Sequence, residues 1–180
     1  MGAMEESRAV AAGEADRFGV AALQRLYDAE LDAVYGFVFR RCGETALTQD
    51  IVHDVFVLAA RRVADGEPVP GPGWLYSTAR SRLVDHWRRE ARRERKLRLV
   101  AGGGRDAEPD LADHVTSGDE LVQLLSTLSP RHQAVLVLKY VDGYSTEEVA
   151  ASMDTSPKAV ESMLARARRS LADALEEVER

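Results

Sequence analysis

The chain has 180 residues, of which 45% are hydrophobic and 6% aromatic, and its formal net charge is −6. This length suits one ordinary domain or two small ones, and a core made mostly of Leu, Val and Ala favours helices over a sheet sandwich. The single cysteine, Cys42, excludes an internal disulfide. We find no run of eighteen apolar residues and no signal-like N-terminus, so we expect a cytoplasmic protein without membrane insertion.

Charge is strongly zoned along the chain. Residues 80–98 carry nine Lys or Arg against three acids, whereas residues 102–120 carry one base against six acids. A chain with net negative charge is not expected to coat nucleic acid, but a confined basic segment can still hold phosphates. Taken alone, the arginine run is equally compatible with a solvated helix face.

Apolar residues three and four apart predict a helix over residues 18–41, after an N-terminal tail of residues 1–17. Gly43 is the expected stop, and a second helix is predicted from near Thr45 or Thr48 to about Val63. The loop over residues 65–73 contains three prolines and three glycines, and Trp74 begins a long third helix. The predicted core positions of the second and third helices are Ile51, Val52, Val55, Phe56, Ala59, Leu75, Ala79, Leu83, Val84 and Trp87.

Residues 99–118 lack clear periodicity and are predicted to be an acidic, flexible linker. We therefore expect an all-α fold with two small helical domains, residues 18–98 and 119–180. In the second domain a helix is predicted over residues 119–128, with Leu121, Leu124, Leu125 and Leu128 facing inward. Ser129 and Pro130 begin the next helix, with core positions Val135, Leu136 and Leu138, and VDGYS (141–145) ends it.

Two helix starts follow in quick succession. Ser145 with Glu148 forms a capping box, and the short helix behind it is expected to bury Val149, Ala150 and Met153. The chain turns at Asp154–Thr155, Ser156 caps the next helix, and Pro157 takes its first position. An apolar stripe then runs through Val160, Leu164, Ala167 and Leu171. Two helices joined this closely must cross steeply, which predicts a helix-turn-helix.

The outer face of the second of these helices has the chemistry of a DNA-recognition helix. Cations hold phosphates and short polar groups contact base edges. The candidate DNA-contacting residues are Lys158, Glu161, Ser162, Ala165, Arg166 and Arg169. The plain alternative is an amphipathic surface helix that never touches DNA.

In combination these segments resemble the extracytoplasmic-function (ECF) sigma factors of bacterial RNA polymerase, the sigma-70 family group with only the sigma-two and sigma-four domains. QDIVHDVFVLAARR (49–62) is similar to the polymerase-binding helix, and GWLYSTARSRLVDHWRRE (73–90) to the promoter-melting helix. LSPRHQAVLVLKYVDGYSTEEVAASM, followed by SPKAVESMLARARRSL, is similar to sigma-four. The resemblance implies core RNA polymerase and promoter DNA as partners, no catalytic activity and no cofactor or metal.

Within this resemblance, helix 49–62 would bind the β′ clamp helices, and sigma-four would bind the β flap and the −35 element. The implied polymerase contacts are Asp50, His53, Asp54 and Arg61, with His53 standing where the family often has Gln. The implied −10 contacts are Trp74, Arg80, Ser81, Arg82, Arg88 and Arg89, supported by Arg92 and Arg93. The alternative to base stacking for Trp74, and likewise for Trp87, is a position in the hydrophobic core. Ser81 stands where the family often has Asn.

The resemblance also implies that the linker acids Asp106, Glu108, Asp110 and Asp113 imitate nucleic acid inside the polymerase, and that an anti-sigma factor regulates the protein. Asp154 stands where the family often has Gly, and it can adopt the left-handed conformation at some cost. Glu161 and Met163 stand where the family usually has Lys or Arg, which suggests an unusual promoter sequence. The main competing hypothesis is a stand-alone DNA-binding regulator. A helical adaptor leaves the basic segments unexplained, and the four scattered histidines give no support to an enzyme.

Overall fold

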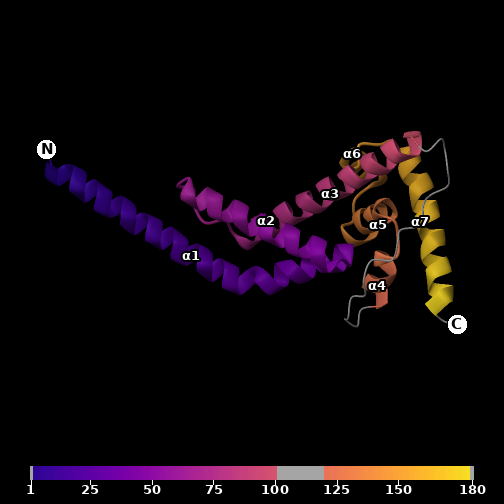
Figure 1. The fold of residues 1–180 in the computed structure, drawn as a ribbon, viewed down its shortest axis with the longest axis horizontal. Coiled ribbons are helices and arrows are strands. Elements are labelled where there is room, and N and C mark those ends of the chain that lie inside the picture. The colour runs from indigo at the N-terminus through magenta and orange to yellow at the C-terminus, as the bar shows by residue number, and fades with distance from the viewer. Residues whose placement is uncertain (1, 101–119, 179–180) are drawn as a thin grey trace.

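A computed structural model describes residues 2–100 and 120–178 of the chain. Within these residues the fold is all-α, with seven α-helices and one short π-helix (Figure 1). Residues 101–118 of the predicted linker lie outside the described residues, whereas residues 99 and 100 still belong to a helix.

The N-terminal group consists of α1 (Gly2–Cys42), α2 (Thr45–Ala64) and α3 (Pro72–Val100). Helix α1 begins sixteen residues before the predicted start, and its N-terminal part projects beyond α2 (Figure 1). The predicted start of this helix was wrong, because residues 2–17 are rich in Ala, Glu and Arg, which are strong helix formers. Helix α3 begins at Pro72. The first N–H groups of a helix have no acceptor within it, so the missing N–H of proline loses no helix hydrogen bond there.

The predicted apolar faces of α2 and α3 form the core of this group. The five predicted positions of α2 are all buried, and Leu75, Ala79 and Leu83 of α3 are fully buried. Trp87 is 2% exposed, so it is a core residue. Trp74 is half-buried against the core, and the Arg62 guanidinium lies 5.2 Å from the centre of its ring.

The C-terminal group consists of α4 (Glu120–Ser126), α5 (Pro130–Leu136), the π-helix η1 (Val137–Val141), α6 (Thr146–Ser152) and α7 (Pro157–Val178). Helix α4 is shorter than predicted. The hydroxyls of Ser126 and Thr127 donate to the carbonyls of Gln123 and Leu124, which satisfies groups left open at the helix end. Leu128 is buried beyond this end, as predicted for the core, and Ser129 caps α5.

The helix ends at VDGYS (141–145) as predicted, but the turn that leads into this segment is the π-helix η1. The Asp142 N–H donates to the Val137 carbonyl at 2.9 Å, and the Tyr144 N–H donates to the Leu138 carbonyl at 2.9 Å. Gly143 follows with φ +73°, a conformation that glycine adopts without a steric cost. Such π-helical turns are frequent at functional sites, and this one leaves the Asp142 side chain buried rather than in solvent.

The two groups pack against each other and share one cluster of buried hydrophobic residues. Helix α3 contacts α5, and α1 contacts α4. The approach is close at Gly43, where a Cβ atom would lie 2.9 Å from both the Val122 carbonyl oxygen and the Ser126 Cβ. Nothing in the sequence pattern predicted how the two groups would be oriented.

Candidate nucleic-acid and polymerase surfaces

The helix-turn-helix begins with both hydrogen bonds of the predicted capping box. The Ser145 side chain accepts from the Glu148 N–H at 3.1 Å, and the Glu148 carboxylate accepts from the Ser145 N–H at 2.7 Å. The second bond stabilises the charged carboxylate and lowers the pKa of Glu148. Behind the cap, Val149, Ala150 and Met153 are buried as predicted, so α6 is fixed to the core.

The turn between α6 and α7 depends on Asp154, whose φ is +51°. The Thr155 N–H closes the turn by donating to the Ala150 carbonyl at 2.9 Å. Ser156 then caps α7 by accepting from the Ala159 N–H at 3.2 Å. The left-handed residue turns the chain within a few positions, so α6 and α7 are joined by a short, tightly bonded turn.

Helix α7 presents the six predicted DNA-contacting residues on one exposed side, at spacings of three and four residues. Its opposite side buries Val160, Leu164 and Ala167. Met163 is only 6% exposed, so it belongs to the core, and its departure from the family pattern does not alter the recognition face. The unusual residue that remains on that face is Glu161.

The predicted polymerase contacts of α2 also form one exposed stripe. All four of these residues, Asp50, His53, Asp54 and Arg61, lie opposite the buried face of the helix. The Asp54 carboxylate lies 3.9 Å from Arg82 of α3. Both side chains are well exposed, so solvent screens this ion pair and it contributes little to stability.

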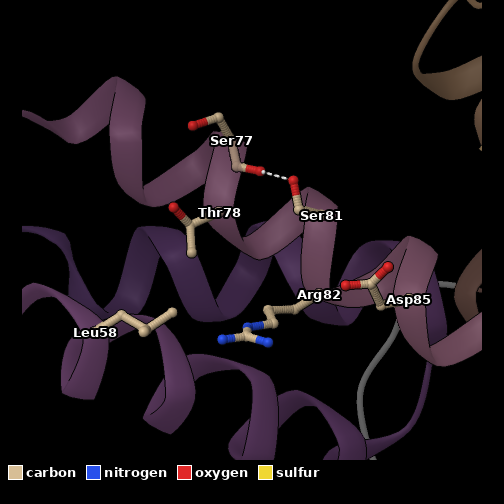
Figure 2. Close-up of a pocket in the computed structure, with 6 residues that line it drawn as sticks. All are labelled: Leu58, Ser77, Thr78, Ser81, Arg82 and Asp85. Carbon is tan, nitrogen blue, oxygen red and sulfur yellow. Dashed lines mark hydrogen bonds between the residues drawn. The ribbon is translucent and has the colours of Figure 1, made fainter.

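A shallow hollow of about 200 Å³ lies between α2 and α3 (Figure 2). Its lining is Leu58, Ser77, Thr78, Ser81, Arg82 and Asp85. Figure 2 shows Ser81 bonded to the Ser77 carbonyl, at 3.0 Å, while Arg82 reaches between the two helices. Hydroxyl groups beside a guanidinium are suited to phosphate and sugar oxygens, so the hollow is a candidate binding surface for nucleic acid.

The structure does not gather all six predicted −10 contacts on one surface. Ser81 and Arg82 line the hollow, Arg89 is exposed, and Trp74 packs against the core. Arg80 and Arg88 instead bind groups in the C-terminal helices. The Asp142 carboxylate accepts the hydrogen bond from Arg80. The sequence did not point to Asp142, because an acidic residue before a glycine in a loop gives no indication of a partner far away in the chain.

The single cysteine, Cys42, lies in the core of the N-terminal group. Burial raises the pKa of the Cys42 thiol, whose sulfur lies 3.2 Å from the Thr48 hydroxyl. Among the residues with described positions, no three His, Cys, Asp or Glu side chains are grouped to hold a metal ion. The helices of the described ranges include none that is both long and apolar enough to span a membrane.

Comparison with known proteins places the chain in a family. The family described as Sigma-70 region 2 matches residues 26–93, and the family described as Sigma-70, region 4 matches residues 118–171. The RNA polymerase sigma factor CnrH of Cupriavidus metallidurans is 32% identical over 71% of this chain and 72% of its own length. The chain belongs to the ECF group of sigma-70 RNA polymerase sigma factors.

Other relatives cover more of the chain. The ECF RNA polymerase sigma factor BldN of Streptomyces coelicolor is 31% identical over 94% of this chain, which spans 64% of the length of BldN. The ECF RNA polymerase sigma factor SigL of Mycobacterium tuberculosis is 29% identical over 88% of this chain and 92% of its own length. A solved structure of the sigma factor RpoE in complex with the anti-sigma factor NepR, from Bartonella quintana, is also similar. The match covers 85% of this chain and 96% of the solved chain, with 20% sequence identity and a TM-score of 0.45.

Proposed function

We propose that this protein directs core RNA polymerase to specific promoters and initiates transcription there, in the cytoplasm. The observation that carries this proposal is the capped helix-turn-helix with an exposed recognition face, in the segment that matches Sigma-70 region 4. An enzyme has no comparable support. A stand-alone DNA-binding regulator would need only α6 and α7, and it would leave the polar stripe on α2 without a role.

At the −35 element, α7 would lie in the major groove. Lys158, Arg166 and Arg169 would hold phosphates, which provides affinity without sequence information. Ser162 and Glu161 would face base edges, where a Glu side chain accepts a hydrogen bond from the cytosine amino group. Ala165, which is exposed and small, would allow close approach of the helix or contact a thymine methyl group.

At the −10 element, the hollow between α2 and α3 would receive the separated non-template strand. Ser81 and Arg82 would contact the strand first, since they already line the hollow. Arg89 extends this surface along α3, and Arg80, Arg88 and Trp74 would add contacts once DNA is bound. Unstacking a base costs a few kcal/mol, which such polar and stacking contacts offset.

These roles divide the chain into two working parts. We propose that residues 18–98 bind polymerase and the −10 element, and that residues 119–180 bind the β flap and the −35 element. The acidic linker between them, residues 99–118, would enter the polymerase, where its carboxylates imitate nucleic acid. This division explains why a chain with a net charge of −6 carries a strongly basic helix, α3, and a basic segment in α7, residues 158–169.

Run-off transcription with core polymerase and a genomic promoter library tests the proposal. We expect transcripts from a small set of promoters that share two conserved elements. Exchange of Ser162 or Glu161 for Ala should change the preferred bases of the upstream element. Exchange of Arg166 or Arg169 for Ala should weaken all promoters similarly and lower the salt slope of binding by about one. Specific duplex binding without any polymerase-dependent transcript would instead establish the stand-alone regulator.

The polymerase surface can be tested by charge reversal. Asp50→Lys and Asp54→Lys should each reduce co-purification with core polymerase, because both carboxylates lie in the exposed stripe of α2. Asp173→Lys makes the same change at an exposed position of α7, and it should have no effect. Unchanged co-purification for both α2 variants would remove this surface from the proposal.

We further propose that an anti-sigma factor covers the α2 stripe and the basic face of α7 in uninduced cells. The two surfaces are separate, so a partner that binds both gains avidity from their linkage. A pull-down from the native cell without induction tests this. We expect a stoichiometric small protein that blocks transcription in vitro, whereas recovery of polymerase alone would indicate control by synthesis.

A further inference from the structure

A pair of side chains joins η1 to α7 beside the candidate recognition face. The guanidinium carbon of Arg168 lies 5.8 Å from the centre of the Tyr140 ring, which is within the range of a cation–π contact. Both side chains are exposed, Tyr140 to 58%. Neither residue belongs to the six candidate DNA-contacting residues of α7, and neither has a role in the proposed function.

The wider turn of η1 brings Tyr140 to the surface beside α7. Leu138 is fully buried, and Val141, three residues later, would continue its apolar stripe in an α-helix. In η1 the Asp142 N–H instead donates to the Val137 carbonyl, and Val141 is exposed. Helix α5, which leads into η1, packs against α7 (Figure 1). Tyr140 therefore reaches the flank of α7 rather than the core.

Arg168 lies on the flank of α7 that the candidate contacts leave open. Successive residues of an α-helix are turned by about 100° around its axis. Ala167 is fully buried, so Arg166 and Arg168 point away from it on opposite flanks of the helix. Ala165 and Arg169 lie between these flanks, at the centre of the exposed face. One flank therefore carries Arg166, and the other carries Arg168.

The Arg168 guanidinium is held in place without losing its charge. Its contact is with a neutral ring, and no carboxylate of the described residues lies within ion-pair distance of it. A guanidinium has N–H donors in its plane, whereas the ring lies over its carbon and accepts none of them as an oxygen would. The Tyr140 ring thus restricts where the side chain lies and leaves its donors available for an acceptor outside the protein.

We propose that Arg168 is a further phosphate contact of the −35 element and that Tyr140 is its positioning residue. This rests on the proposed function, in which α7 lies in the major groove. The walls of that groove are the two DNA backbones, about 12 Å apart. A helix between them can place one cation against each strand, here Arg166 and Arg168. Tyr140 reduces the rotamer freedom that Arg168 would otherwise lose on binding.

Binding of the full chain with core polymerase to a fluorescein-labelled promoter duplex, chosen from the run-off products, tests the phosphate contact. Arg168→Ala should weaken all promoters similarly and lower the salt slope by about one. Arg25→Ala, which removes the same charge from an exposed position of α1, should leave the slope unchanged. An unchanged slope for Arg168→Ala would overturn the contact.

Methylphosphonates at single positions, each of which removes one phosphate charge, test the placement on two strands. The wild type should be sensitive to substitutions on both strands of the −35 element. Arg168→Ala should lose its sensitivity at a position on one strand, and Arg166→Ala at a position on the other. Loss at the same position for both variants, or at none for Arg168→Ala, would overturn the placement.

The positioning role has its own test at Tyr140. Tyr140→Leu should lower affinity about two- to fivefold, the range of a cation–π contact at an exposed site, and Tyr140→Phe should retain affinity because it keeps the ring. When Arg168 is already Ala, Tyr140→Leu should have no further effect, since the ring acts through Arg168. Val141→Ala, at the neighbouring exposed side chain of η1, is the control and should not alter affinity.

Circular dichroism verifies that each variant keeps its helices. An equal loss for Tyr140→Phe and Tyr140→Leu, or additive losses in the double variant with Arg168→Ala, would overturn the positioning role. Failure of the proposed function would appear separately, as the absence of run-off transcripts from the wild type.

Discussion

The turn of the helix-turn-helix offers a direct test of the backbone through Asp154. This residue is exposed and has φ +51°, in the left-handed region that favours glycine. Its backbone is held by the Thr155 N–H bond to the Ala150 carbonyl, which any residue at 154 can retain. A substitution here therefore changes the conformational preference of one residue without changing a buried contact.

Asp154→Gly should stabilise the fold relative to Asp154→Ala. An L-residue in the left-handed conformation costs roughly 1–2 kcal/mol, and Gly avoids this cost. Gly also gives the unfolded chain more freedom, which removes about 0.4–1 kcal/mol of that gain. The expected difference between the two variants is about 1 kcal/mol, with wild-type Asp between them. For a chain of this length that corresponds to roughly 2–4 °C in Tm.

Thermal unfolding followed by circular dichroism measures this order of stability. Ala172→Gly is the control, because Ala172 is exposed within α7 and Gly there should destabilise the fold by about 1 kcal/mol. If Asp154→Ala proved as stable as Asp154→Gly, residue 154 would not be left-handed in solution. The short turn between α6 and α7 would then need another explanation.

Three further outcomes follow from single side chains. Ser145→Ala, which removes the acceptor for the Glu148 N–H, should lower the free energy of unfolding by about 1 kcal/mol in a urea titration. Cys42 should react with a thiol reagent far more slowly than a free thiol at pH 8, because it is 3% exposed and burial raises its pKa; rapid labelling would contradict its described position. Burial lowers the pKa of His86, against the opposing effect of Glu90, so the folded protein takes up this proton less readily than the unfolded chain. The free energy of unfolding should therefore fall as pH decreases below about 6.5. His86→Gln should reduce this loss of stability.

Local features of the sequence were sufficient for much of the fold and for the candidate recognition surface. The apolar face of α2 and the burial of Val149, Ala150 and Met153 were confirmed, since each depends on residues three or four positions apart on one helix. The capping box was confirmed for the same reason, because both of its hydrogen bonds join Ser145 and Glu148, three residues apart. The exposure of the six candidate DNA-contacting residues follows from the apolar stripe on the opposite side of α7.

Tertiary structure decided what those patterns left open. Trp87 and Met163 have side chains compatible with either a surface or a core, and their burial depends on the helices packed over them. The bond between Arg41 and Asp142 joins residues 101 positions apart, and no periodicity along the chain can indicate such a partner. A helix pattern specifies which side of each helix avoids water. Which buried side meets which, and which arginine meets which carboxylate, depends on the simultaneous packing of all the helices.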